Sequence, residues 1–459
     1  MNSVVRLETL RFKNLKNVNN GELFFSERKK LERGEYDEEE KLSSVLGIYG
    51  QNGSGKTTAL NALRLIQNLL GGSFINPVFS DFVNANETVL SVGADFFIRM
   101  ASGDYYVYYD IDIRKNENRL LDVINERLSY FKYGDEKRKN NLYEFTAPDR
   151  IKETFSGRLT QKNRAIYQYL SSIETSGLKN NGLAYSSIFN QKTLRILSEP
   201  SNDLNEFISI VMALSDFANN NLAIYDINYF NENDNVGIRF RVKDEIRGMN
   251  TVGDIFVPFT PYALDSVAFG VFEKVIGKIN KVMPSIIPGF TISIVKTNNQ
   301  QNQRITNKIE FIMTSKRGND KPIALIYESN GIKKIISILS GLIDSYSHEG
   351  TLMAIDEIDS GIFEYLLGEI VYSFDNFGKG QLMFTSHNMR VLEKVNYRNI
   401  FFTTTDHNNA FVQLTKIRDS NNLRDMYYRY IANGYEKDIK LYDMVKTEEL
   451  IGSLFVDGD

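Results

Sequence analysis

The sequence contains no cysteine, few histidines and no long apolar run. The absence of cysteine excludes disulfides, thiolate metal sites and a cysteine nucleophile. The three histidines, His348, His387 and His407, are too scattered for a zinc cluster of familiar spacing. The N-terminus carries early charge and no signal-peptide segment, and no window approaches the roughly eighteen uncharged apolar residues of a membrane span. We therefore expect a cytoplasmic protein without a membrane partner.

The bulk composition is that of an ordinary globular protein. Apolar residues make up 42% of the chain and charged residues 24%. With 459 residues, the chain is too long for one ordinary core, so about two or three lobes are expected. The formal net charge of −4 gives no global argument for nucleic-acid binding, although it says nothing about local basic patches.

The hydrophobic pattern divides the chain into three parts. Residues 1–130 show short alternating runs, which predict a hairpin and then an antiparallel meander over 88–128. Residues 131–220 are polar with helical spacing and no sustained heptads, which predicts a helical insertion but no coiled-coil arm. Residues 221–459 return to strands and a βα series before a mostly helical tail. The expected fold is α/β, with a mixed core sheet, an antiparallel β subdomain and the helical insertion.

Two further predictions concern a helix near residue 270 and the charged run after the first hairpin. A helix over 267–282 is expected to end before Met283-Pro284, because proline lacks the backbone N–H that a helix uses. The charged run over 27–41 is typical of a solvated loop or exposed helical turn, with a partner-docking tip as the alternative.

The strongest chemical signal is a phosphate-binding loop. Residues 50–57 read GQNGSGKT and match the pattern GxxxxGK[ST]. Its glycines let consecutive backbone N–H groups point at phosphate oxygens, and the following helix adds its positive N-terminal end. Lys56 would reach the β- and γ-phosphates, and the Thr57 hydroxyl can ligate Mg²⁺. A short apolar strand precedes the loop and an amphipathic helix follows it, as this motif requires.

An apolar strand ending in two adjacent acids supplies a second signal. Residues 351–357 read TLMAIDE, the arrangement of a Walker B strand. Asp356 would hold Mg²⁺, directly or through water, and Glu357 would polarise the attacking water. Strands often end in acids without any such role, so this interpretation depends on neighbouring motifs.

One neighbouring motif opens a helix upstream. Residues 328–334 read ESNGIKK, where Ser329 is a natural N-cap and Gly331 keeps the first turn open. The simple interpretation is a capped helix. The functional one is an ABC signature motif, whose helix N-terminus grips the γ-phosphate of nucleotide bound to the opposite subunit.

The other neighbouring motifs lie downstream. The strand QLMFTSHN ends at His387, about thirty residues after the acid pair, or one βαβ crossover. His387 would then lie near the γ-phosphate as a switch histidine, the alternative being a structural histidine. Asp359 would belong to a D-loop that crosses a dimer interface, or to a helix-capping turn.

These motifs together resemble the ABC-type AAA family ATPases of bacterial anti-phage defence. This group is similar to RecF, SMC and overcoming-lysogenization-defect ATPase heads, and to the ATPase subunits of PARIS, Septu and AbiL type systems. The segments RLETLRFKNLKNV and INKVMPSIIPGF add looser support. The family usually has Asp or Gly where this chain has Asn330, and no glutamine is assigned here to the Q-loop.

The resemblance implies an ABC/SMC-like P-loop ATPase head that closes as a homodimer, or a larger oligomer, around ATP and Mg²⁺. It implies catalytic roles for Lys56, Glu357 and His387, and metal binding by Thr57 and Asp356. The implied nucleotide-binding set is Asn52, Gly53, Ser54, Gly55, Lys56, Thr57, Thr58, Ser329, Gly331 and Asp359.

Three functions are consistent with the sequence. The first is a defence ATPase that controls a separate effector, commonly a nuclease; no acid-rich nuclease segment is recognised in the roughly hundred residues after Glu357. The second is a RecF-like clamp that binds DNA, for which Arg138, Lys139, Arg158, Lys162 and Arg164 are basic candidates. The third, an ABC transporter subunit, lacks the LSGGQ form of the signature.

Overall fold

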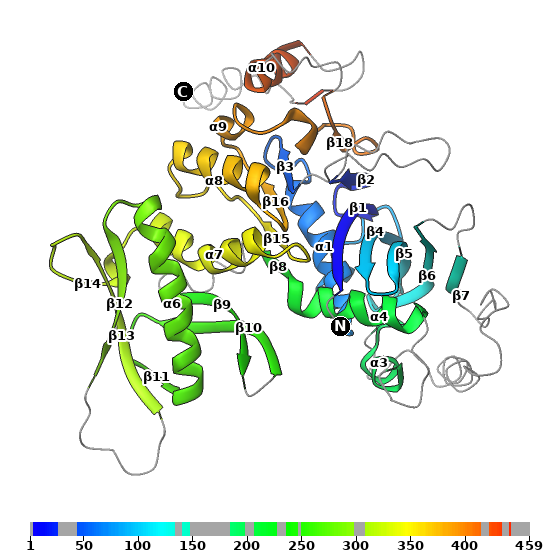
Figure 1. Cartoon of the computed structure of the whole chain (residues 1–459). Coiled ribbons are helices and arrows are strands. Elements are labelled where there is room, and N and C mark those ends of the chain that lie inside the picture. Colours follow the sequence, from blue (N-terminus) through cyan, green and yellow to red (C-terminus); the bar gives the residue numbers. More distant parts are fainter. Residues whose placement is uncertain are drawn as a thin grey trace, which may run out of the picture.

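The computed structural model shows an α/β protein built around a buried sheet (Figure 1). No helix in the part of the chain that it describes is long and apolar enough to cross a membrane. The structure describes residues 3–25, 44–133, 140–146, 184–197, 206–226, 236–246, 249–297, 308–414, 422–433 and 440–441.

The core sheet has six strands in the order β18-β17-β3-β16-β15-β8, and only its edge strand β18 is antiparallel. Every residue of β3, β8, β15, β16 and β17 is buried, as expected for parallel strands covered on both faces. The strands are β3 (Val45–Tyr49), β8 (Leu222–Tyr225), β15 (Leu352–Ile355), β16 (Gln381–Thr385), β17 (Ile400–Thr403) and β18 (Phe411–Val412).

The two faces of this sheet belong to different cores. Alternate residues of β3 enter one or the other, with Leu46 in the first core and Tyr49 in the second. The first core holds α1 (Lys56–Leu70), and the second holds α7 (Asn330–Ser347) and α8 (Glu364–Phe377). Helix α1 also contacts β1 and β4, so it lies between the core sheet and the antiparallel sheet.

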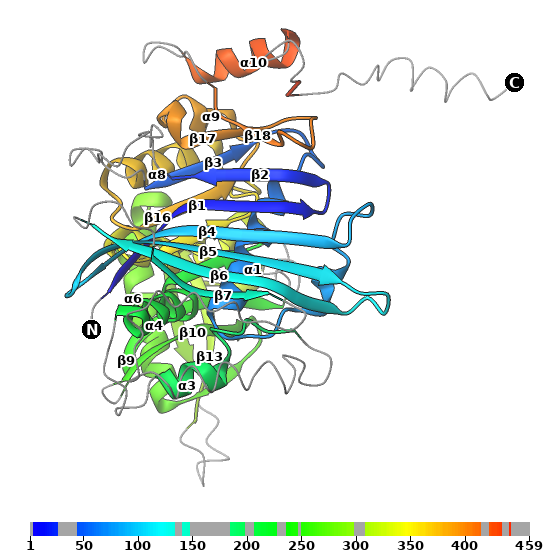
Figure 2. The same cartoon turned by 90° about the vertical axis from the view of Figure 1, so that its right-hand side faces the viewer.

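The antiparallel sheet confirms the predicted hairpin and meander. Its order is β2-β1-β4-β5-β6-β7, and Figure 2 shows these long strands side by side. They are β1 (Val4–Leu15), β2 (Val18–Phe24), β4 (Val89–Met100), β5 (Gly103–Lys115), β6 (Leu121–Lys132) and β7 (Asn140–Thr146). The expected α/β class, with a mixed core sheet and an antiparallel subdomain, is therefore confirmed.

The segment expected as a helical insertion is partly strand. Strand β7 falls inside 131–220 and pairs antiparallel with β6, so it extends the meander. Helices α3 (Gln191–Leu197) and α4 (Glu206–Asp216) follow, and a π-helix, η3 (Phe217–Asn221), leads into β8. The charged run over 27–41 lies outside the described residues, as do the basic candidates between 138 and 164.

A further lobe is formed by strands around α6 (Ser266–Ile286). The prediction that this helix ends before Pro284 is wrong. Pro284 lies in its last turn, so the helix loses one backbone hydrogen bond there and ends at Ile286, and the fully buried Met283 packs that turn into the core. The strands are β9 (Gly237–Ile246), β10 (Met249–Pro258), β11 (Tyr262–Asp265), β12 (Phe290–Lys296), β13 (Lys308–Arg317) and β14 (Ile323–Ala324).

The remaining described elements are short. They are the 3₁₀ turns η1 (Pro77–Ser80), η4 (Leu325–Tyr327) and η5 (Tyr397–Asn399), and the helices α9 (Met389–Leu392) and α10 (Leu423–Asn433).

One buried amide joins the two large sheets. The Gln381 side chain, at the start of β16, donates from Nε2 to the Leu7 carbonyl at 2.7 Å and accepts from the Leu7 N–H at 2.9 Å. Nearby, the Arg6 guanidinium donates to the Lys379 carbonyl at 2.7 Å. The Gln381 contacts satisfy backbone groups of β1 where a bulge at Leu7/Thr9 interrupts its pairing with β4, and the Arg6 contact satisfies the carbonyl of Lys379.

The Gln381→Leu variant tests this joint. It should lower the free energy of unfolding by about 2–4 kcal/mol, because both Leu7 backbone groups would be buried without partners. The matched variant Gln413→Leu, at an exposed hydrogen bond, should change it by less than about 1 kcal/mol. Urea unfolding of the two proteins measures the difference, and equal values would contradict the assigned role.

Candidate nucleotide-binding site

The loop over residues 50–57 adopts a conformation that requires glycine. Gly50, Gly53 and Gly55 have φ of 151°, 79° and 105°. A Cβ at Gly50 would lie 1.6 Å from Thr403 Oγ1, so both the backbone angle and the space exclude a side chain there. The loop therefore curls tightly between β3 and α1, with its backbone free to approach an anion.

Lys56 lies inside this loop and is only 7% exposed. Its Nζ donates to the carbonyls of Gly50 at 2.8 Å and Gln51 at 2.9 Å. Burial lowers the pKa of Lys56, and the charges of Asp356, Glu357 and Asp359 oppose that shift. The charges of all three carboxylates therefore act on this ammonium, although they follow in the sequence by some three hundred residues.

The acid pair is held by a hydroxyl from the next strand. Thr385 Oγ1 donates to Asp356 Oδ1 at 2.5 Å and accepts from the Glu357 N–H at 2.7 Å. Asp356 is 4% exposed, whereas Glu357 is exposed and has a left-handed φ of 46°. The turn after β15 therefore buries one carboxylate and presents the other outward, a backbone strain typical of functional sites.

His387 lies against the same turn. Its backbone N–H donates to Asp359 Oδ2 at 3.1 Å. Burial and the neighbouring Lys56 lower the pKa of His387, although the three carboxylates act in the opposite direction. The imidazole is consequently neutral at neutral pH, when it can both donate and accept hydrogen bonds.

The predicted signature residues form a second group. Ser329 Oγ accepts from the Ile332 N–H at 3.3 Å and so caps α7. A Cβ at Gly331 would lie 1.8 Å from the Gly361 carbonyl, which means that the helix start rests directly on the loop containing Asp359. Exposed aromatic side chains flank the two segments: Tyr327 is 80% exposed and Phe363 is 69% exposed.

Sequence reasoning missed several residues that contact the loop. Asn17 Nδ2 donates to the Gly53 carbonyl at 2.6 Å, and Ser54 Oγ lies 2.5 Å from Thr403 Oγ1. The Lys16 ammonium lies over the Phe82 ring at 4.1 Å from its centroid; burial lowers the pKa of Lys16, and the charge of Asp356 opposes that shift. The left-handed φ of 52° at Lys16 makes the turn between β1 and β2, and no local pattern signals that contact.

The donor set suits a magnesium–phosphate complex better than a metal cage. No group of three or more His, Cys, Asp or Glu residues within the described ranges could hold a metal ion. Mg²⁺ is usually held by one or two carboxylates together with substrate phosphates and water. Asp356 and the Thr57 hydroxyl fit that arrangement.

Comparison with known families gives one match. The profile described as "AAA domain, putative AbiEii toxin, Type IV TA system" matches residues 45–393, which include the loop over 50–57, Ser329, the acid pair and His387. No curated protein matches the chain.

Solved structures are similar only at low identity. The SMC head domain from Thermotoga maritima is 13% identical, with a TM-score of 0.37 over 89% of this chain and 98% of that one. The Smc head with coiled coil and joint from Pyrococcus yayanosii is 10% identical, with a TM-score of 0.40 over 90% and 97%. The RecF–ATP structure is 13% identical, with a TM-score of 0.34 over 83% and 92%.

The Thr385→Val variant tests how the acids are positioned. Removing Oγ1 frees the Asp356 carboxylate without changing side-chain volume, so Mg²⁺-dependent ATP affinity should fall by about 10- to 100-fold. The control variant Thr351→Val also replaces a threonine hydroxyl by a methyl group, but Thr351 lies before β15, away from Asp356. This variant should bind the ATP analogue with the affinity of the parent. Titration of both with a fluorescent ATP analogue, with and without Mg²⁺, measures the effect; equal affinities would contradict it.

Acid titration tests the environment of His387. The unfolded chain takes up a proton at the ordinary pKa of about 6.5, whereas the folded site does so only at lower pH. His387 should therefore reduce stability progressively as pH falls from about 6.5 to its lowered pKa. Urea unfolding at neutral and mildly acidic pH should show a smaller loss in His387→Gln than in the parent. The exposed-site control His407→Gln should behave like the parent.

Proposed function

The chain belongs to this AAA-domain family, and on that premise we propose that it is an ATPase whose heads pair around ATP and Mg²⁺. The observation that carries the proposal is the meeting of Lys56 with Asp356, Glu357 and Asp359 at one edge of the core sheet. A phosphate-binding lysine beside an acid pair is the constellation that phosphoryl transfer to water requires.

The residues divide the chemistry among them. When nucleotide binds, the Lys56 ammonium exchanges the Gly50 and Gln51 carbonyls for phosphate oxygens. Mg²⁺, held by Thr57 and Asp356, would neutralise charge on the phosphates. The exposed Glu357 accepts a proton from water, and neutral His387 donates a hydrogen bond toward the γ-phosphate.

The second group of residues supports pairing between subunits. Ser329 caps α7, Gly331 packs against Gly361 in the loop that contains Asp359, and the exposed aromatic residues Tyr327 and Phe363 lie beside these segments. Large exposed apolar side chains commonly mark interaction surfaces. In a two-fold dimer, the positive start of α7 from one subunit would cap the nucleotide bound by the other.

We further propose a defence role in which the ATPase controls a separate effector, such as a nuclease. The support is the family description, which names a toxin of a toxin–antitoxin system. Co-purification from native cells tests this role. Recovery of a nuclease with the chain would support it, and a chain that is active alone on DNA would overturn it.

Mixed variants test hydrolysis and pairing together. Lys56→Ala removes the phosphate contact. Ser329→Asp keeps a good helix cap but adds a negative charge facing the partner's γ-phosphate. Each variant alone should lose ATP hydrolysis. Mixed in equal amounts, they should recover about a quarter of the parent rate, because each mixed dimer contains one intact site.

The neutral cap variant Ser329→Asn is the control and should keep most of its activity. A parent protein that does not hydrolyse ATP would refute the enzymatic proposal. Recovery to no more than the background of the separate variants would refute the shared site.

A further inference from the structure

A pocket of about 270 Å³ lies between β9, α6 and α7. On α7 its lining begins at Ser340, about 15 Å along the helix from Asn330, and none of its lining comes from residues 50–57. The pocket is therefore distinct from the nucleotide-binding loop. Its lining residues are Arg241, Lys243, Val275, Lys278, Ser340, Ile343, Asp344, Ser347 and His348.

Cations dominate this pocket. Arg241 and Lys243 are two residues apart on β9, so both side chains point from the same face of the strand. Lys278 reaches the pocket from α6. Against these three full positive charges the lining contains one carboxylate, Asp344.

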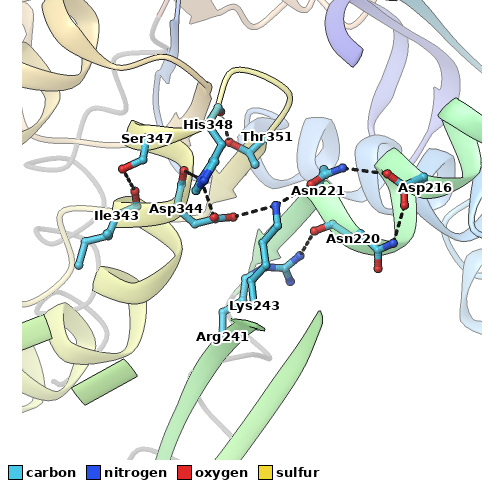
Figure 3. Close-up of polar contacts among 10 residues, drawn as sticks. All are labelled: Asp216, Asn220, Asn221, Arg241, Lys243, Ile343, Asp344, Ser347, His348 and Thr351. Carbon is cyan, nitrogen blue, oxygen red and sulfur yellow. Dashed lines mark hydrogen bonds and ion pairs between the residues drawn. The ribbon is translucent and has the colours of Figure 1, made fainter. Parts of the chain in front are cut away.

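The one carboxylate of the lining, Asp344, contacts both His348 and Lys243. Figure 3 shows His348 and Lys243 on either side of Asp344. His348 Nδ1 lies 2.9 Å from Asp344 Oδ1, and Lys243 Nζ lies 3.7 Å from Asp344 Oδ2. The same Nδ1 lies 3.0 Å from the Asp344 carbonyl. Because both of its partners are acceptors, Nδ1 carries the hydrogen, and Nε2 is left for another contact.

Within the described part of the chain, Arg241 and Lys243 also donate to neutral acceptors of η3. Arg241 Nη2 donates to the Asn220 carbonyl at 3.2 Å, and Lys243 Nζ donates to Asn221 Oδ1 at 2.9 Å. Asp254 lies opposite Arg241 in the pairing of β9 with β10, outside the pocket lining. The lining itself therefore keeps an excess of positive charge for a ligand.

We propose that this pocket binds the phosphate group of an anionic ligand. Its volume is just below the roughly 300 Å³ at which pockets begin to hold drug-sized molecules, so the bound part is small. The lining contains no Phe, Tyr or Trp side chain on which a base could stack, whereas Arg and Lys donors with the Ser340 hydroxyl match phosphate oxygens.

The phosphate could come from two sources. A free phosphate or phosphomonoester fills the pocket by itself. A nucleic-acid strand would continue along α6, where Lys274 and Lys281 are exposed at helical spacing from Lys278. Both sources present phosphate oxygens to the pocket, and they differ in whether the protein binds a nucleic-acid strand.

The test measures inorganic phosphate binding by ³¹P NMR at constant ionic strength, in full-length protein carrying Lys56→Ala to silence the nucleotide loop. Binding should persist in this background. Adding Lys278→Gln should weaken it by about five- to tenfold, because one charge-assisted contact is lost. Adding Lys281→Gln, an exposed change outside the pocket lining, should leave it unchanged.

A short single-stranded oligodeoxynucleotide forms the second arm. Binding tighter than that of phosphate and weakened by Lys278→Gln identifies a nucleic-acid backbone as the source. Phosphate binding without oligonucleotide binding identifies a small free anion. Loss of all phosphate binding in Lys56→Ala, or equal affinities in the Lys278 and Lys281 variants, would overturn the proposal. Thermal melting of each variant shows that the comparison is between folded proteins.

Discussion

The parallel pairing of β3, β16 and β15 is the constraint on which the candidate site depends. Thr385 lies opposite Ile48, and Ile355 lies opposite Phe384, so the three strands finish at the same edge of the sheet. In open parallel sheets, ligands bind outside the carboxyl ends of the strands. The register therefore decides that the phosphate loop, the acid pair and His387 meet, because each follows directly after one of these strands.

Burial makes that register unambiguous. Successive residues of a strand point to opposite faces, so Leu46 and Ile48 enter the core shared with α1, while Val45 and Tyr49 enter the core shared with α7 and α8. A shift by one residue would exchange the two sets and disrupt both cores. Strands that are apolar on both faces thus fix the positions of the polar residues that follow them.

Buried polar side chains connect the elements that hydrophobic packing alone would leave free to slide. Gln381 bonds both backbone groups of Leu7, and the fully buried Glu126 accepts hydrogen bonds from Tyr109, Ser186 and Ser187. Because an unsatisfied buried polar group is costly, each such pair has one arrangement of lowest energy. The same principle operates in the site, where Thr385 serves Asp356 and Glu357 at once.

The sequence alone determined the elements whose signals are local. The glycine pattern before Lys56, the apolar strands before Asp356 and His387, and the Ser329 cap each depend on residues within one turn or strand. Tertiary structure decided which of them meet. It brought Asn17 and Thr403 to the phosphate loop, made the strand over 140–146 part of a sheet, and gathered Arg241, Lys243 and Lys278 around one pocket. These contacts join segments distant in the chain, and their partners are chosen by the burial of whole faces, which no local pattern records.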